Sequence, residues 1–319
     1  MRNRIELLNV DLLNQSDLLA EIDHWLKVFN WQQGWHYDLD MIWTINLIEE
    51  YGLKPGATIL DAGGGLGMTQ FLLAARGYNV ISLDFNTRIG PKYSKGIFNI
   101  GIENTDLEGY HHEYMDFMDY GLTPNTKPFI SRLNNFINKI KITPEYFYFT
   151  MKNKLVNFIN PYYLIEKWFN SHDTFGELTF LRGSFNKIPL SDNKIDFLVS
   201  ISAFEHNKYE DMPSSVDEFL RVLKPGAPLT LTTSAAEKND WYFEAPQAWN
   251  FTKETLQSWF FISNNNTSFN YADALKKMIS SDMLKKRISG FYKYNKNNAL
   301  PYGKIEDASY YPVGIVKIK

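Results

Sequence analysis

Apolar residues recur every three or four positions in two segments near the start of the chain. The first is DLLAEIDHWLKVFNW, residues 17–31, and the second is DLDMIWTINLIEEYGL, residues 38–53, which runs into Gly52 and Pro55. This spacing places apolar side chains on one face of an α-helix, and glycine and proline are typical of a helix end. We therefore expect N-terminal helices within residues 1–50.

Short apolar runs and helical segments then alternate along the chain. Residues 57–60 form an apolar run, a glycine-rich turn follows, and a helical segment extends to residue 75. YNVISLDFN, residues 78–86, is a second apolar run that reaches Asp84. Strand, turn, helix and strand within about 30 residues are the parts of a βαβ unit.

The alternation resumes after residue 176 with the runs LTFLRGSF, KIDFLVSIS and PLTLTTS, the last two separated by a helical pattern in MPSSVDEFLRVL. KRISGFYKY, residues 286–294, and YYPVGIVKIK, residues 310–319, are interpreted as an antiparallel pair at the sheet edge. We expect an α/β fold: a doubly wound, mostly parallel seven-stranded sheet with helices on both faces.

Residues 91–176 interrupt this alternation and are expected to form an inserted helical cap. Residues 101–120 carry six acidic and no basic side chains, whereas residues 127–154 carry six basic side chains and one acidic. Residues 145–170 add nine aromatics at roughly helical intervals. Three roles stay open: packing against the main domain or a second subunit in a homodimer, a substrate lid, or peripheral membrane contact.

Composition excludes several classes of protein. The 319 residues are 44% hydrophobic and 16% aromatic, enough for a large core, and the lack of cysteine excludes disulfides and thiolate nucleophiles. A net charge of -3 gives no global attraction for a polyanion, so nucleic acid is not an expected partner. The N-terminus lacks the apolar core of a signal peptide and no stretch could span a bilayer, which predicts a cytoplasmic location.

The stretch DAGGGLG, residues 61–67, carries the clearest chemical signal. It lacks the lysine and hydroxyl residue of a phosphate-binding P-loop, and no frame of it fits the dinucleotide pattern G-x-G-x-x-G. What it does contain is Asp61 followed by glycines at every second position, with Asp84 at the end of the next strand. Glycines let the backbone approach a ligand without a Cβ in the way.

At these residues the chain resembles the class I S-adenosylmethionine-dependent methyltransferases. The resemblance continues in GSFNKIPLSDNKIDFLVSISAFEHN, residues 183–207, and in FLRVLKPGAPLTLTT, residues 219–233. It implies that residues 51–90 and 177–319 form a domain that binds S-adenosylmethionine. The cofactor-binding residues it implies are Asp61, Gly63, Gly65, Gly67, Asp84, Phe85, Ser184, Phe185 and Ser202.

Three of these positions have separate implied roles. Asp84 is expected to accept hydrogen bonds from the ribose hydroxyls, and the helix that begins near Gly67 to direct N–H groups at the methionyl carboxylate. Ser184 stands where the family often has an aspartate that meets the adenine amino group, and a serine oxygen is also an acceptor.

Candidate catalytic and substrate residues lie around this domain. His206 follows the fourth strand, where ligands bind in this architecture, and is either a general base or a helix cap. Tyr37 and Trp241 belong to aromatic segments that either cover the acceptor or pack in the core. His111 and His112 lie in YHHEYMDFMD, residues 110–119, interpreted as a substrate-lining acidic patch, a solvated face or a metal site, and no metal is expected.

The sequence therefore predicts an S-adenosylmethionine-dependent methyltransferase that acts on a small-molecule or glycan-like acceptor, with O-methylation favoured because candidate bases are present. Two alternatives stay open. One is a nicotinamide-dependent oxidoreductase or epimerase on a similar sheet, and the other is a cofactor-binding protein without catalytic activity.

Overall fold

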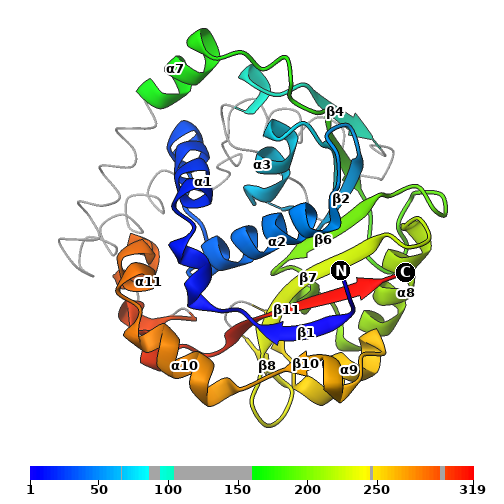
Figure 1. The fold of residues 1–319 in the computed structure, drawn as a ribbon, viewed down its shortest axis with the longest axis vertical. Helices are drawn as coiled ribbons and strands as arrows, with labels where there is room; N and C mark the ends of the chain where they lie inside the picture. The colour runs from blue at the N-terminus through cyan, green and yellow to red at the C-terminus, as the bar shows by residue number, and fades with distance from the viewer. Residues whose placement is uncertain (66, 86–93, 104–159, 245–246, 295–298) are drawn as a thin grey trace, which may run out of the picture.

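The computed structural model describes residues 1–319 except 66, 86–93, 104–159, 245–246 and 295–298. A nine-stranded sheet crosses the molecule in the order β10-β1-β11-β7-β6-β2-β3-β5-β4, and helices pack against it (Figure 1). The α/β class and the mostly parallel sheet are confirmed, and the strand count is nine rather than seven.

The parallel part of the sheet consists of short strands that are buried on both faces. It contains β2 (Thr58–Ala62), β3 (Asn79–Asp84), β5 (Leu178–Arg182), β6 (Phe197–Ile201) and β7 (Pro228–Ala235). Parallel pairs join β2 to β3 and β6, β3 to β5, and β6 to β7. All five coincide to within two residues with runs that their apolar composition predicted.

The antiparallel strand β11 (Tyr311–Ile318) lies beside β7 rather than at the edge of the sheet. Its other neighbour is β1 (Arg4–Leu7), which in turn pairs with β10 (Thr267–Ser268). The prediction of an antiparallel strand over residues 310–319 is therefore confirmed, but its predicted place at the edge is wrong.

Residues 286–294, the other half of the expected antiparallel pair, form no strand. Their sequence lies in α11 (Asp282–Arg287) and α12 (Gly290–Lys293). Ser281 caps the first of these helices by accepting a hydrogen bond from the N–H of Leu284 at 3.2 Å. Arg287 then pairs with two carboxylates near the N-terminus of the chain, so local capping and a distant ion pair outweigh the alternating pattern.

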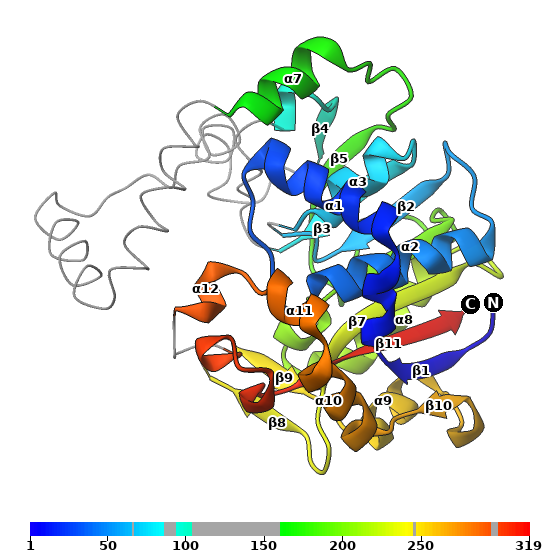
Figure 2. The same ribbon diagram turned by 60° about the vertical axis from the view of Figure 1, so that its left-hand side comes forward.

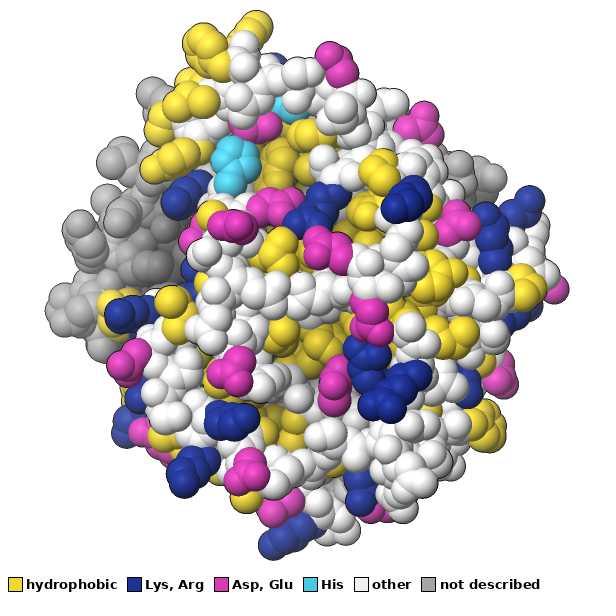
Figure 3. Space-filling model, viewed as in Figure 1, with side chains coloured by type: hydrophobic (Ala, Val, Ile, Leu, Met, Phe, Trp, Pro, Cys, Tyr) yellow, Lys and Arg dark blue, Asp and Glu magenta, His cyan; other side chains and the backbone are white. Residues whose placement is uncertain are grey.

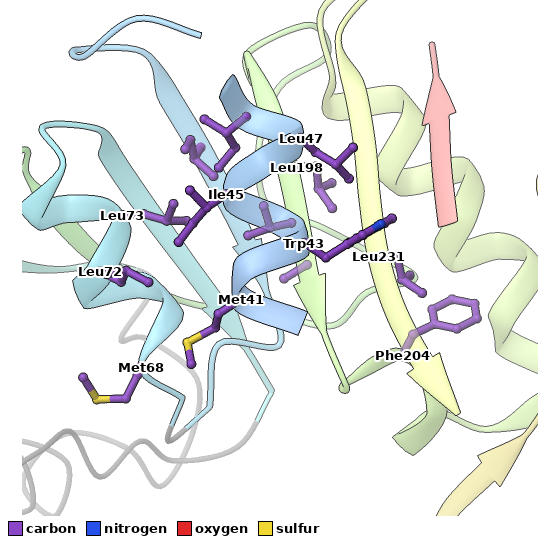
Figure 4. Close-up of a cluster of buried hydrophobic side chains, with 14 of the residues drawn as sticks. Met41, Trp43, Ile45, Leu47, Met68, Leu72, Leu73, Leu198, Phe204 and Leu231 are labelled. Atoms are coloured by element: carbon purple, nitrogen blue, oxygen red, sulfur yellow. The ribbon is translucent and has the colours of Figure 1, made fainter. Parts of the chain in front are cut away.

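Helix α2 (Tyr37–Tyr51) is the central helix of the core. It lies against β6, β7 and β11 on one side, while α1 (Ser16–Phe29) and the short helix η1 (Val10–Asn14) cover it on the other. This explains why nearly all of its residues from 38 to 48 are buried. Figure 4 shows Met41, Trp43, Ile45 and Leu47 of α2 among side chains of the sheet and of α3 (Thr69–Ala75).

Other helices complete the fold. Behind the sheet lies α8 (Met212–Val222), which packs on α9 (Lys253–Phe260), and α10 (Tyr271–Ser280) follows along the lower edge in Figure 1. A separate hairpin joins β8 (Trp241–Phe243) to β9 (Ala248–Asn250).

Only the two ends of the expected insertion, residues 91–176, are described. They contain η2 (Ser94–Gly96), β4 (Ile100–Glu103) and α7 (Pro161–Phe169) (Figure 2). β4 pairs in parallel with β5 and forms one edge of the sheet, so the sheet extends into the expected insertion. The opposed charge segments, and with them a homodimer through the insertion, lie outside the described residues and stay predictions.

Candidate functional site

A cavity of about 850 Å³ opens at the carboxyl ends of the parallel strands, a common place for ligands in open α/β sheets. Its volume lies within the range of about 300–1,000 Å³ typical of small-molecule sites. Every residue predicted to bind the cofactor contributes to its wall, as do two of the candidate catalytic and substrate residues: Asp61, Gly63, Gly65, Gly67, Asp84, Phe85, Ser184, Phe185, Ser202, Tyr37 and His206.

The backbone of the glycine loop has a conformation and a close approach to its neighbours that residues with side chains would not allow. Gly63 and Gly65 have φ values of 81° and 42°, in the left-handed region. A Cβ on Gly63 would also lie 2.3 Å from Cβ of Ala203 and 2.8 Å from Cζ of Phe185. The loop is therefore drawn close to the neighbouring strand ends, and its backbone faces the cavity.

Asp84 is held at the cavity by this loop. Its Oδ2 accepts a hydrogen bond from the backbone N–H of Gly65 at 2.9 Å. The loop itself is tied to β3, because the N–H of Gly63 donates to the carbonyl of Leu83 at 2.8 Å. Asp84 and the glycine loop that stood out in the sequence are thus joined by hydrogen bonds.

A buried polar cluster supports the loop from below. Ser82 and Gln70 are fully buried and hydrogen-bonded to each other, and Gln70 Nε2 also donates to the carbonyl of Gly67 at 2.9 Å. A Cβ on Gly64 would lie 2.1 Å from Ser82 Oγ and 2.6 Å from Asp61 Oδ2. Gly64 is therefore required by packing against this cluster, although it is not part of the alternating motif.

Ser184 presents an acceptor oxygen to the cavity. Its hydroxyl donates to Oδ1 of Asn186 at 2.6 Å, and an amide oxygen can only accept. With its proton used in this way, Ser184 Oγ can act toward a ligand only as an acceptor. Nearby, Phe85 is largely exposed, and the Arg182 guanidinium lies 5.9 Å from the centroid of its ring.

A buried carboxylate lies behind the other wall of the cavity. Glu205 accepts hydrogen bonds from Ser202 Oγ at 2.7 Å and from Thr233 Oγ1 at 2.9 Å. Burial, and next the charge of Glu205, raise the pKa of Tyr37 well above its usual value, although a hydrogen bond with Ser202 opposes the shift. Tyr37 therefore keeps its hydroxyl proton at neutral pH.

The imidazole of His206 has a defined protonation pattern. Its Nδ1 lies 3.0 Å from the backbone carbonyl oxygen of Gln247. A carbonyl oxygen only accepts, so Nδ1 must carry a proton, and in the neutral ring Nε2 then holds the lone pair. The ring is exposed and contributes to the cavity wall.

A second cavity of about 530 Å³ adjoins the first and shares His206, Asn207 and Lys208 with it. Its aromatic walls are Tyr242 and Trp249 of the β8–β9 hairpin, whose ring centroids are 5.2 Å apart. The remaining residues around it are Tyr209, Glu210 and Gln247.

The structure separates the other aromatic candidates. Trp241 lies on the hairpin but contributes to neither cavity. Trp35 and His36 are buried, and His36 Nδ1 lies 2.6 Å from Oδ2 of the equally buried Asp40, so both belong to the core. His111 and His112 lie outside the described residues.

Sequence reasoning missed one side of the first cavity. This side is built from the segment that precedes α2, from the start of α3, from the end of the loop after β6 and from α12, and its residues are Trp31, Gln32, Gln33, Gly34, Met68, Thr69, Lys208, Asp211 and Tyr292. The aromatic segment around residues 35–37 was the nearest available signal. No pattern in the sequence indicates that Tyr292 is close to the glycine loop.

The described residues contain neither a cluster of metal-binding side chains nor a helix that could span a membrane. Within them, no group of three or more histidine, aspartate or glutamate side chains is placed to hold a metal ion. None of the helices in the described ranges is long and apolar enough to cross a membrane.

Comparison with known families places this site in context. A family model described as a methyltransferase domain matches residues 160–231, from the start of α7 into β7. The match includes the strand ends that carry Ser184 and Ser202, and it lies outside the glycine loop. Comparison of the sequence with curated proteins gives no match.

Solved structures of low sequence identity are also similar to the chain. One is from Galdieria sulphuraria, described as a candidate sarcosine dimethylglycine methyltransferase, with 17% identity, TM-score 0.44, and coverage of 88% of this chain and 84% of that one. An S-adenosylmethionine-dependent methyltransferase from Methanosarcina mazei has 15% identity, TM-score 0.41, and coverage of 86% and 96%. Haemonchus contortus phosphoethanolamine N-methyltransferase 2, solved with S-adenosylhomocysteine, has 12% identity, TM-score 0.43, and coverage of 97% and 60%.

Residues 160–231 of the chain thus match a methyltransferase domain, and they lie within a mostly parallel α/β sheet.

Proposed function

We propose that this protein is a class I S-adenosylmethionine-dependent methyltransferase, that it methylates a hydroxyl group of a small, glycan-like acceptor, and that His206 is the general base. The observation that carries the proposal is the 3.0 Å contact between His206 Nδ1 and the Gln247 carbonyl, which leaves the Nε2 lone pair to accept a proton. His206 belongs to the walls of both cavities, so a molecule that spans them passes this ring.

The cofactor is proposed to occupy the first cavity over the glycine loop. The positive φ values of Gly63 and Gly65 and the close approach of Ala203 suit a loop that must meet a ligand with its backbone. Asp84, fixed by the N–H of Gly65, is proposed to bind the ribose hydroxyls, and Ser184 Oγ to accept from the adenine amino group.

Phe85 and Phe185 are proposed to lie against the adenine ring, and the glycine-loop N–H groups near the methionyl end. Ser202 lies at the end of β6 with a φ of 47°, an uncommon value for a side-chain-bearing residue, and this carries its hydroxyl into the cavity wall. The remaining acid of the motif, Asp61, is proposed to complete the cradle beneath the loop.

When bound, S-adenosylmethionine supplies the methyl group for an in-line displacement, which depends mainly on alignment of the reacting atoms. The residues of the chain would hold the acceptor hydroxyl beside the cradle, and Nε2 of His206 would accept its proton as the new bond forms. Tyr37, which keeps its hydroxyl proton, is proposed to donate a hydrogen bond to the acceptor from the opposite wall.

The residues around the second cavity suit a polar acceptor that contains a ring. Tyr242 and Trp249 offer flat apolar surfaces, while Lys208 and Glu210 beside them can donate and accept hydrogen bonds. A sugar ring combines an apolar face with hydroxyl groups at its rim, so it matches both features. We propose that the body of the acceptor lies here and that its reactive hydroxyl points toward His206.

The test measures transfer of a labelled methyl group to a panel of glycosides and their amino-sugar counterparts. Label on the hydroxyl compounds is expected, and His206→Ala should lower kcat by about 10²- to 10⁴-fold without changing the Kd for S-adenosylhomocysteine. His206→Asn is the matched control, since it can still donate to Gln247 but cannot accept a proton in this way. If His206→Asn keeps the native rate, or if only amines are labelled, the proposal is wrong.

A further inference from the structure

Helix α7 (Pro161–Phe169) is attached to the rest of the molecule through polar groups. Asn160, at its N-terminal cap, donates to the carbonyls of Lys27 and Val28 at 2.9 and 2.8 Å and accepts from the N–H of Tyr162. The buried carboxylate of Glu166 lies 2.9 Å from His24 Nε2. Surface helices of globular proteins usually do the reverse, since they bury an apolar stripe and expose their polar side.

Most of the apolar side chains of α7 instead face outward, while Tyr163 packs against the core. Of the twelve large hydrophobic side chains that are exposed in the described part of the chain, five belong to this nine-residue helix. They form a contiguous stripe, because their spacings of three and four residues place them on one side of a helix. We call this stripe the outer face of α7: Tyr162, Leu164, Ile165, Trp168 and Phe169, exposed by 49%, 43%, 54%, 70% and 82%. Figure 3 shows yellow side chains gathered at the upper edge of the molecule, over α7.

Two lysines lie at aromatic rings of this outer face. The Lys167 ammonium lies 5.5 Å from the centroid of the Trp168 ring, and that of Lys27 lies 6.0 Å from the Tyr162 ring. The single acid within the helix, Glu166, is buried and directed at His24. This positive charge is local, because the whole chain has a net charge of -3.

We propose that the outer face of α7 binds an anionic membrane surface. A short helix with exposed tryptophan, tyrosine and aliphatic side chains beside lysines has the composition of helices that lie in the lipid headgroup region. Each lysine near an anionic leaflet adds to the attraction, and the apolar side chains leave water. A second copy of the chain is a poorer occupant, because a symmetric contact would bring two faces together that both carry Lys27 and Lys167 and no exposed acid of the helix.

The test is flotation of the full chain with vesicles of phosphatidylcholine, with and without phosphatidylglycerol. Binding is expected to depend on phosphatidylglycerol and to weaken with added salt. The double variant Trp168→Ser with Phe169→Ser should reduce the bound fraction about tenfold or more, because it removes the two most exposed apolar side chains. Its melting temperature and its affinity for S-adenosylhomocysteine should stay those of the native chain, which shows that the variant is folded.

The chain offers a matched control in Phe261. This residue is 77% exposed at the end of α9, and the Lys317 ammonium lies 5.9 Å from its ring, so it has the same combination of groups. It lies at the opposite end of the molecule from α7 in Figures 1 and 2. Phe261→Ser should therefore leave vesicle binding unchanged.

Three results would overturn the proposal. Absence of binding to vesicles that contain phosphatidylglycerol is the first, and equal binding by the native chain and the double variant is the second. The third is a combination of two observations: the native chain does not bind vesicles, and light scattering shows that it is an oligomer whereas the double variant is a monomer. A second copy of the chain would then cover the outer face of α7.

Discussion

Replacement of Gly64 with alanine is expected to destabilise the protein as a whole. The new Cβ would lie 2.1 Å from Ser82 Oγ and 2.6 Å from Asp61 Oδ2, both closer than van der Waals contact allows. Both neighbours are buried, so neither can move into solvent without disturbing the core. The φ of Gly64 is not in the left-handed region, and the effect therefore comes from packing rather than from backbone strain.

The expected loss in the free energy of unfolding is the sum of two contributions. Overpacking at a buried site costs about 1–3 kcal/mol. If Ser82 rotates away, its hydrogen bond with the fully buried Gln70 is lost as well, which costs about 1 kcal/mol more. We expect Gly64→Ala to lower the free energy of unfolding by about 2–4 kcal/mol. The Kd for S-adenosylhomocysteine should also rise, because Gln70 holds the carbonyl of Gly67.

The assay is urea unfolding followed by circular dichroism, and Gly52→Ala is the control. Gly52 has a φ of 75° but nothing within 4 Å of its Cβ position, so this change should cost only backbone strain of about 1–2 kcal/mol. Adding Ser82→Ala to Gly64→Ala should recover part of the loss, since it removes the nearest atom. The reasoning is refuted if Gly64→Ala costs no more than Gly52→Ala, or if the two changes at 64 and 82 are additive.

Three further predictions concern single side chains. Asp84→Ala should raise the Kd for S-adenosylmethionine by about 10- to 100-fold in calorimetry, the scale for lost hydrogen bonds to a charged group. Asn160→Ala should lower the protection of α7 amides in hydrogen exchange by about 1–2 kcal/mol, because it removes a helix cap. Burial raises the pKa of Tyr311 to about 12, so the stability that it contributes is complete below about pH 10 and falls as the pH rises toward 12; urea unfolding at several pH values measures this.

Each of these predictions has its own contrary result. An unchanged Kd in Asp84→Ala would remove the ribose role of that carboxylate. Native exchange rates in α7 after Asn160→Ala would mean that its cap and its bonds to α1 do not hold the helix. For Tyr311→Phe, the loss of stability above pH 10 should become shallower, and an identical pH dependence would assign that loss to other groups.

The central sheet could be predicted because its information is local. Apolar runs of strand length, separated by glycine and helical patterns, predicted β2, β3, β5, β6 and β7. β1 was not predicted, since its four residues alternate charged and apolar side chains over too short a run to define a strand and its partner β11 lies far away in the sequence. The wrong strand over residues 286–294 has a similar cause, because Arg287 is placed by Asp23 and Asp38.

In the candidate site, too, features that depend on residues close in sequence could be predicted, and features that depend on distant residues could not. The glycine loop and Asp84 were found from spacing alone, because a single βαβ unit brings them together. A glycine is required at position 64 because a side chain there would collide with Ser82, which lies on a neighbouring strand. Nothing in the sequence shows that contact. Tyr292 reaches the cavity only through the folding of the C-terminal helices, so its place depends on tertiary structure.

The pairing of β1 with β11 also has a consequence for folding during synthesis. β1 is synthesised before β7, yet it joins the sheet through β11, which follows β7 in the sequence. Until β11 emerges, β7 has no partner on that side, although all eight of its residues are buried in the finished sheet. The nascent chain thus carries an unpaired edge of β7 from the synthesis of residue 235 until β11 has emerged, and β11 then closes it.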